Sequence, residues 1–216
     1  ASVEVSKGPS SAMAGRGSTG GTINQISKTA QLDSFVKGTL ASGSDELGRV
    51  TLDANETLAE DIALRVNLMG HSADASGRDV VESQRWGLAP TLSFGLDSDT
   101  RTTLSYFHQE QDNIPDYGHP YGKPDAKGVR HPVEVERDNF YGYSHLDFED
   151  ITTDLATVLV EHDFDDALSL RSQFRYGTTD RASVITAPRL SAPNYNVLSR
   201  GPRSRLGQAF GAPLPA

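Results

Sequence analysis

An alternation of apolar and polar side chains, sustained over stretches of about 10 to 14 residues, limits what this chain can fold into more than any other feature. Val50, Leu52 and Ala54 alternate with polar neighbours, and Leu92 and Phe94 do the same further along the chain. A period of two puts the apolar residues on one face of a β-strand and the polar residues on the other. The pattern predicts strands at residues 33–43, 46–56, 61–72, 85–97, 101–112, 151–164 and 167–178.

The length of these strands separates two kinds of β protein. Strands of globular proteins peak near about five or six residues, whereas a tilted strand that crosses a membrane needs about 9–11. Tight turns at residues 57–60 and 97–100 also alternate with long connections at residues 71–85 and 112–150, as in outer-membrane barrels. The prediction is an all-β chain that forms a partial antiparallel transmembrane β-barrel, an open meander of about seven long strands. A soluble β-rich ligand-binding module with one dry face is the alternative.

The barrel interpretation also predicts which side chains face lipid. On the convex side of the sheet it places the apolar members of the alternating pattern, among them Val50, Leu52, Leu64, Val66, Leu92, Phe94, Leu168 and Leu170. Pro90 falls inside one of the predicted strands, where it has no N–H to donate to a neighbouring strand, so a bulge or a local break is expected there.

Composition narrows the classes of function. The formal net charge is −9 and the pI is about 5.1, which argues against a nucleic-acid binder. Cysteine is absent, so neither a disulfide nor a thiolate metal site can form. His119, His131 and His145 are spaced too irregularly for a metal-binding motif. Because no catalytic motif is found either, we expect no catalytic residues, no metal site and no cofactor, and predict that the chain is not an enzyme.

A glycine-rich segment precedes the predicted strands. Residues 3–28 read VEVSKGPSSAMAGRGSTGGTINQISK. A phosphate-binding loop would need a Lys-Ser or Lys-Thr pair before a helix, whereas residues 22–26 have the pattern of a strand. The segment instead resembles the end of the plug domain of TonB-dependent outer-membrane siderophore receptors, and its G-R-G-S-T-G-G stretch looks most like receptors of the catecholate type. The resemblance implies that residues 1–32 are the C-terminal end of a plug domain and that residues 33–190 are the N-terminal part of the barrel.

The longest expected loop, residues 112–150, is rich in turns, aromatic side chains and basic side chains. Its P-D-Y-G-H-P-Y stretch resembles the corresponding loop of catecholate receptors. A ferric tris-catecholate is an anion with aromatic rings, so cationic and aromatic side chains suit it. The expected ligand-binding residues are Arg16, Tyr117, His119, Tyr121, Lys127 and Arg130. For Arg16, a structural ion pair with a carboxylate of the barrel wall is the alternative.

The resemblance also implies a transport role. A full-length receptor of this family binds a ferric siderophore at its outer face, and TonB then displaces the plug to admit the ligand. The implied partners are the ferric siderophore, TonB, whose contact region is absent from this chain, and outer-membrane lipid; nucleic acid is not among them. The implied location is the outer membrane of a Gram-negative bacterium. Because the siderophore already encloses the iron, no protein ligand to the metal is required.

The pattern changes after about residue 190. Residues 191–216 contain Pro193, Pro202, Pro213 and Pro215 and show no alternation of strand length. We expect an irregular tail there, disordered or frameshifted, with no barrel strand. The plug motif begins at Val3, so the chain is expected to be a fragment, and a nonfunctional truncation product is a third interpretation. Alone, the fragment is not expected to insert into a membrane, because an open sheet leaves backbone groups unsatisfied in lipid.

Overall fold

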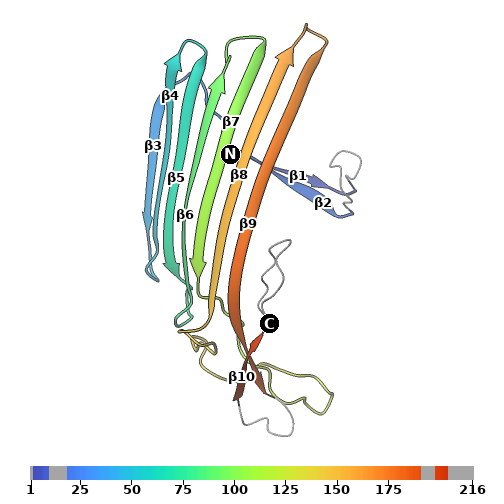
Figure 1. Ribbon diagram of the computed structural model, residues 1–216. Helices are drawn as coiled ribbons and strands as arrows, with labels where there is room; N and C mark the ends of the chain where they lie inside the picture. The colour runs from blue at the N-terminus through green and yellow to red at the C-terminus, as the bar shows by residue number, and fades with distance from the viewer. Residues whose placement is uncertain (1, 10–18, 191–197, 204–216) are drawn as a thin grey trace, which may run out of the picture.

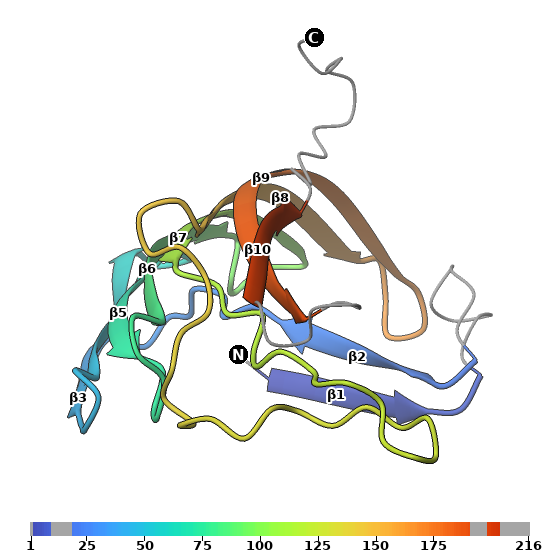
Figure 2. The same ribbon diagram turned by 90° about the horizontal axis from the view of Figure 1, so that it is seen from below.

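A computed structural model describes residues 2–9, 19–190 and 198–203, and its regular secondary structure in these ranges is entirely β-strand (Figure 1). No helix in these ranges is long and apolar enough to span a membrane. The strands form two antiparallel sheets, one small and one large. The small sheet is a hairpin of β1 (Ser2–Lys7) and β2 (Gly21–Ile26), which lies on the concave side of the large sheet (Figure 2).

The large sheet is a meander in which each strand pairs with the next one along the chain. Its strands are β3 (Phe35–Ser42), β4 (Gly48–Ala59), β5 (Ile62–Asp74), β6 (Glu82–Phe94), β7 (Thr100–Asn113), β8 (Phe148–Asp163), β9 (Ser169–Leu190) and β10 (Leu198–Arg203). Strands β3 to β9 correspond one for one to the seven predicted strands. The predicted all-β meander is therefore confirmed.

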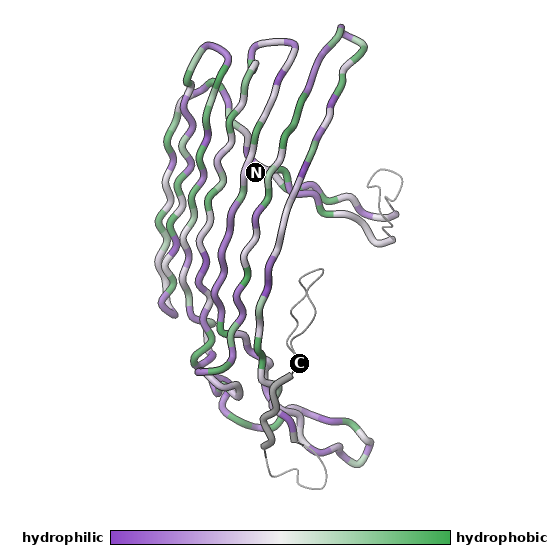
Figure 3. The backbone as a smooth tube through the Cα atoms, in the orientation of Figure 1, coloured by the Kyte–Doolittle hydropathy of each residue, from purple (hydrophilic) through white to green (hydrophobic). Residues whose placement is uncertain are grey.

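Side chains on the two faces of this sheet differ as the alternation predicts, and the colouring of Figure 3 follows the pattern along each strand. One row on the convex face runs across β5 to β9 through residues that are directly opposite each other: Leu64, Leu92, Leu104, Val158 and Phe174. Phe174 is 69% exposed, and Leu40 on β3 is 83% exposed. In the described ranges, the buried apolar side chains are all small: Ala30, Ala63, Pro120, Ala187 and Pro188. The apolar face of the sheet therefore points away from the chain's own interior.

The concave face is polar, and its largest buried side chains are polar as well. Asn55, Thr91 and Ser93 are 1%, 3% and 0% exposed, and Ser93 shares a hydrogen bond of 3.1 Å with Thr103 on the neighbouring strand. A soluble barrel or sandwich would fill this side with apolar side chains. The arrangement here is the reverse, as in transmembrane barrels, whose outward face is apolar and whose interior is polar.

Two local expectations are modified by the structure. Pro90 causes a break and no bulge: β6 and β7 keep one register, but no pairing is recorded across Ala89 and Pro90. The pairing of β6 with β5, its neighbour on the other side, is continuous there, with Val66 opposite Pro90. Leu168 lies in the turn before β9 and not in the strand itself, and the Asp165 carboxylate accepts its backbone N–H at 2.9 Å.

The end of the large sheet differs from the prediction. Strand β9 continues to Leu190 and does not stop near residue 178, and β10 pairs with its outer part in register from Leu198 opposite Leu190 to Arg203 opposite Ile185. The expectation that residues 191–216 contain no strand is therefore wrong for Leu198–Arg203. The remaining residues of the expected tail, 191–197 and 204–216, lie outside the described part of the chain.

Candidate functional site

The two longest connections of the large sheet lie at the same end. Residues 43–47, 75–81 and 114–147 connect strands at this end, whereas the connections at the other end are residues 60–61, 95–99 and 164–168. In Figure 1 the long connections lie at the bottom, and Figure 2 shows the β7–β8 loop, residues 114–147, extending over the concave side. This end contains most of the residues that were predicted to bind a ligand.

The β7–β8 loop contains a small hairpin of its own. Tyr121 and Pro132 form an isolated antiparallel bridge, and Gly122 donates its backbone N–H to the carbonyl of His131 at 2.8 Å. The turn is closed by Asp125, whose Oδ1 accepts the backbone N–H of Val129 at 2.9 Å. This backbone donor, followed by that of Lys127, holds the pKa of the Asp125 carboxyl below its ordinary value. Asp125 therefore keeps its charge and the turn its shape at neutral pH.

Two of the predicted ligand-binding cations have different surroundings in this hairpin. The guanidinium of Arg130 donates to two backbone carbonyls of the same loop, from Nε to Gly122 at 2.8 Å and from Nη2 to Tyr121 at 2.9 Å. These two hydrogen bonds give Arg130 a structural role within the loop. Lys127 lies in the turn beside Asp125, where its backbone N–H, and not its ammonium group, makes the recorded hydrogen bond at 2.7 Å. Of the two, Lys127 is the cation more available to a ligand.

The aromatic candidates differ in whether their rings are exposed or packed against another ring. Tyr117 and Tyr121 are 55% and 52% exposed, so both rings are accessible on the loop. His119 packs edge-to-face against Tyr141 with 5.8 Å between the ring centroids. Arg16 lies outside the described residues. The structure brings Tyr121 and Arg130 together but leaves the role of all six candidates in ligand binding as a prediction.

Sequence reasoning missed the residue that joins the loops, Arg78 in the β5–β6 connection. Its Nε donates to Asp116 at 2.7 Å, and its Nη1 lies 2.6 Å from Nε2 of His119 and 2.5 Å from the carbonyl oxygen of Arg137. The Arg78 side chain is only 14% exposed. Nearby, Val80 has a φ of +68°, a conformation that a β-branched residue rarely adopts. Arg78 therefore holds the β7–β8 loop against a strained neighbouring turn.

A second anchor fixes the end of the β7–β8 loop to β9. Asp147 is 4% exposed, and its carboxylate accepts the backbone N–H of Thr186 at 3.0 Å and the hydroxyl of the same residue at 2.6 Å. The backbone N–H of Tyr143 donates to the same carboxylate at 3.2 Å. Asp147 thus ties the last turn of the loop to the outer part of β9, which the sequence pattern did not predict to be a strand.

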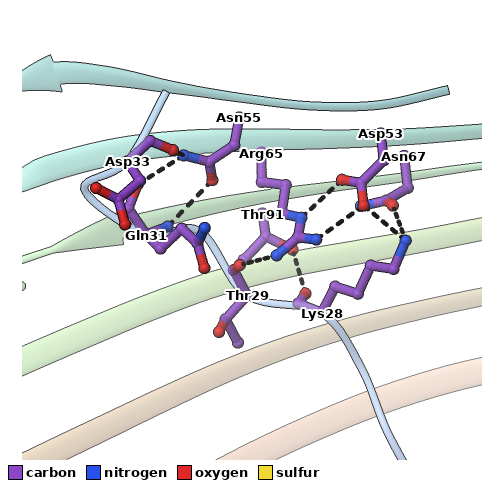
Figure 4. Close-up of polar contacts among 9 residues, drawn as sticks. All are labelled: Lys28, Thr29, Gln31, Asp33, Asp53, Asn55, Arg65, Asn67 and Thr91. Atoms are coloured by element: carbon purple, nitrogen blue, oxygen red, sulfur yellow. Dashed lines mark hydrogen bonds and ion pairs between the residues drawn. The ribbon is translucent and has the colours of Figure 1, made fainter. Parts of the chain in front are cut away.

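The concave wall holds the segment that leaves the β1–β2 hairpin, as Figure 4 shows. Lys28 donates from Nζ to Asp53 on β4 at 2.7 Å and to Asn67 on β5 at 3.0 Å. Arg65 makes two parallel contacts of 2.8 Å with the Asp53 carboxylate and donates from Nη1 to the carbonyl of Thr29 at 2.9 Å. These residues form an ionic anchor between the wall and the connecting segment.

A neutral clamp lies beside this anchor. The side chain of Asn55 accepts the backbone N–H of Gln31 at 3.1 Å and donates to the carbonyls of Gln31 at 2.6 Å and Asp33 at 2.9 Å (Figure 4). Because Asn55 is 1% exposed, each of these bonds satisfies a polar group that water does not reach. The segment before β3 therefore follows the wall along a fixed path.

Nothing in the described ranges groups three or more histidine or acidic side chains in a way that could hold a metal ion. The expectation that the protein needs no cofactor of its own stays a prediction.

Comparison with known proteins gives the same picture of the fold. No protein-family model matches the chain. The probable TonB-dependent siderophore receptor PiuA of Acinetobacter baumannii is 40% identical over 192 residues, which are 86% of this chain and 25% of that protein. The catecholate siderophore receptor Fiu of Escherichia coli K12 is 38% identical over 193 residues, with the same two shares.

A solved structure matches as well. The crystal structure of the ferric-catecholate import receptor Fiu from Escherichia coli K12, in its open form, superimposes with a TM-score of 0.84 and 36% identity over 93% of this chain and 33% of that one. The chain spans about a quarter of the length of the curated relatives it matches. These relatives are transport receptors and not enzymes, and they favour the receptor interpretation over a soluble ligand-binding module.

Proposed function

We propose that this chain, a segment of the TonB-dependent siderophore-receptor family, contributes part of the barrel wall and an outer loop to a receptor that imports a ferric catecholate siderophore. The observation that carries the proposal is the combination of an apolar convex face, a polar concave face and one sheet end with long loops, in a chain 38% identical to a catecholate receptor. The receptor would lie in the outer membrane, with lipid against the convex face.

The chemistry of the loop end suits an anionic aromatic ligand. Tyr117 and Tyr121 present exposed rings, and Lys127 is an exposed cation in the same loop. Cations attract the negative charge of a ferric catecholate, and aromatic side chains stack on its rings. Arg130 supports this surface indirectly, because its guanidinium holds the backbone of the loop hairpin.

Transport would follow from release of the plug while the wall stays in place. TonB, acting on a part of the receptor outside this chain, would move the plug. The ionic anchor of Lys28, Asp53 and Arg65 would keep the connecting segment attached to the wall. No catalytic residue and no bound metal of the protein take part in this mechanism.

The test uses the full-length receptor that contains this segment, produced in a bacterium that lacks its own catecholate receptors. Growth on a ferric catecholate as sole iron source, lost when TonB is deleted, is the expected result. A ferric hydroxamate serves as the control ligand and should support no growth in a host that also lacks its own hydroxamate receptors. Growth that does not depend on TonB, or a receptor that stays in the aqueous fraction without detergent, would contradict the proposal.

Binding to the loop is tested separately. Replacing Lys127 and Arg130 together with Ala should weaken binding of the ferric catecholate more at low salt than at high salt, because exposed charges are screened by salt. Replacing Lys127 alone should cause most of the same salt-dependent loss of affinity as the double replacement, since the Arg130 guanidinium is bonded within the loop. Equal affinity of wild type and double variant at low ionic strength would place the contacts elsewhere.

A further inference from the structure

An apolar cleft of about 320 Å³ lies on the convex face of the large sheet, at the level where no pairing between β6 and β7 is recorded. Side chains of β5 to β8 line it, including Leu92 and Leu104. One row closer to the loop end, Pro90 and Ala156 also line it, and their smaller size leaves the apolar surface hollowed. The cleft therefore interrupts the face that is predicted to contact lipid.

The cleft lies on the side of the wall that stays open when the barrel is complete. The chain spans about a quarter of the length of its curated relatives. Further strands added at the edges of the sheet continue the wall and close it around the concave side. The convex side then remains on the outside, where the proposed receptor meets lipid. An acyl chain has the apolar chemistry that this cleft requires.

Tyr106 connects the cleft to a polar group on the same face. Its ring lines the cleft, and its hydroxyl donates to the carboxylate of Asp154, which also lies 2.8 Å from Nδ1 of His108. Trp86 donates from Nε1 to Glu110 at 2.8 Å, and its ring centroid lies 5.0 Å from that of His108. At its loop side the cleft therefore borders two carboxylates set among aromatic rings.

This part of the convex face is negatively charged. Beyond Glu110 and Asp154 toward the loop end, Asp112 and Asp150 are directly opposite each other on the same face. Among the described residues of β6 to β9, no Lys or Arg occupies a position on this face. An anionic headgroup is repelled by such a surface, whereas an ammonium group is attracted. An ammonium group also donates hydrogen bonds to carboxylates and is attracted to the faces of Trp and Tyr rings.

The order of the two features along the strands fits a single lipid molecule. Asp154 and Ala156 are two residues apart on β8, which is about 7 Å along a strand. The carboxylates lie toward the loop end, and the cleft lies toward the middle of the wall. A lipid with its headgroup at the outer boundary and its acyl chain directed into the membrane contacts both.

We propose that the cleft binds one acyl chain of a phospholipid whose headgroup ends in an ammonium group, and that Glu110, Asp154 and Trp86 receive the ammonium group. The inference rests on the proposed function, because it needs lipid against the convex face, and it adds a specific lipid to that face. The bound chain would cover the level at which β6 and β7 are not paired.

The test uses the full-length receptor in detergent and two lipid probes, phosphatidylethanolamine and phosphatidylglycerol. Native mass spectrometry measures the fraction of receptor that carries one lipid as the lipid concentration is raised. We expect phosphatidylethanolamine to bind at least about tenfold more tightly, as one charge-assisted hydrogen bond provides. Asp154→Asn keeps the shape of the side chain and removes its charge, so it should reduce this preference by about tenfold.

Two matched variants test the cleft itself. Ala156→Phe fills it from an exposed position, and should weaken binding of phosphatidylethanolamine about tenfold, as displacement of about two methylene groups predicts. Ala54→Phe makes the same change on the convex face of β4, outside the cleft, and should bind within about twofold of wild type.

Each contrary result has a definite meaning. Equal binding of the two lipids by wild type would overturn the proposal, as would an Ala156→Phe variant that binds like wild type. Equal losses in Ala156→Phe and Ala54→Phe would also overturn it, because they would show lipid bound over the whole face and not at a site. All three results leave siderophore import intact. A receptor that stays in solution without detergent would overturn both this inference and the proposed function.

Discussion

Arg65 donates two parallel hydrogen bonds of 2.8 Å to the Asp53 carboxylate, from Nε to Oδ1 and from Nη2 to Oδ2. The pair joins two neighbouring strands of the wall, and both partners reach beyond it: Arg65 bonds the carbonyl of Thr29, and Asp53 binds Lys28. A contact that would otherwise only stiffen the sheet therefore also fastens the segment between the β1–β2 hairpin and β3. Movement of the hairpin must leave this pair in place or break it.

Replacing Asp53 with Ala should loosen this segment. The change leaves Arg65, 12% exposed, and Lys28, 37% exposed, as neighbouring cations without their carboxylate. We expect a loss of about 2–3 kcal/mol in the free energy of unfolding, somewhat below that of a fully buried pair because Lys28 is partly solvated. The measurement is thermal or denaturant unfolding of the full-length receptor in detergent, together with the rate of proteolysis within residues 27–34.

The matched control is the double variant Asp53→Ala with Arg65→Ala, which removes both charges of the wall pair. It should be more stable than the sum of the two single losses predicts, because neither charge is left unpaired. Additive losses would show that the two side chains do not depend on each other.

Asp147 provides the corresponding prediction for the loop. Asp147→Ala removes the acceptor of three bonds and leaves the buried backbone N–H of Thr186 unpaired, so it should destabilise the outer part of β9 by about 1–3 kcal/mol. Thr186→Val, which removes only the hydroxyl, should cost less, since the backbone bond remains. Hydrogen exchange of residues 183–190 reports the effect, and equal protection in both variants would argue against an anchoring role for Asp147.

The sequence was sufficient to predict the strands wherever one face is apolar. Leu64, Leu92 and Phe174 follow the period of two, and the structure places them in one convex row. The same signal fails in the outer part of β9, because residues such as Asp180 and Arg181 are polar and exposed on both faces there. Strand β10 was missed for a different reason: it exists by pairing with β9, a contact that local pattern does not encode.

The candidate site could be predicted only as a region. Composition identified the β7–β8 loop, but the bonds of Arg130 depend on a hairpin that closes between Tyr121 and Pro132. The sequence pattern also could not show that Arg49, His71 and Arg85 are neighbours, because they come together only through the register of three strands. The residue types indicate which ligand chemistry is possible, and the pairing of the strands determines which side chains lie next to each other.

Arg78 should control the position of the β7–β8 loop. Arg78→Lys keeps the charge but cannot reproduce a planar group that contacts Asp116, His119 and the carbonyl of Arg137 together. We expect faster hydrogen exchange at residues 114–120 and 137–141 and weaker binding of the ferric catecholate, by about tenfold, the loss expected for one charge-assisted hydrogen bond. Arg101→Lys, at the opposite end of the sheet, is the control and should change neither quantity.

The hairpin of the β7–β8 loop should open in acid through Asp125. Its carboxyl has a pKa below the ordinary value in the folded loop, because the backbone N–H groups of Val129 and Lys127 donate to the charged form. A group whose pKa is lowered on folding stabilises the structure above its unfolded pKa of about 3.9 and loses that contribution as the pH falls below it. The turn should therefore be constant from neutral pH to about pH 5 and loosen below about pH 4.

The amide resonance of Val129, in a receptor labelled selectively at valine, measures this transition. It should shift on acidification in wild type and be nearly independent of pH in Asp125→Asn, which has no carboxyl to titrate. His131, 3.3 Å from the other carboxylate oxygen, is the nearest second titratable group, so His131→Gln is the control that keeps the Asp125 carboxyl. If the transition disappeared in His131→Gln and persisted in Asp125→Asn, the histidine and not the aspartate would close the turn.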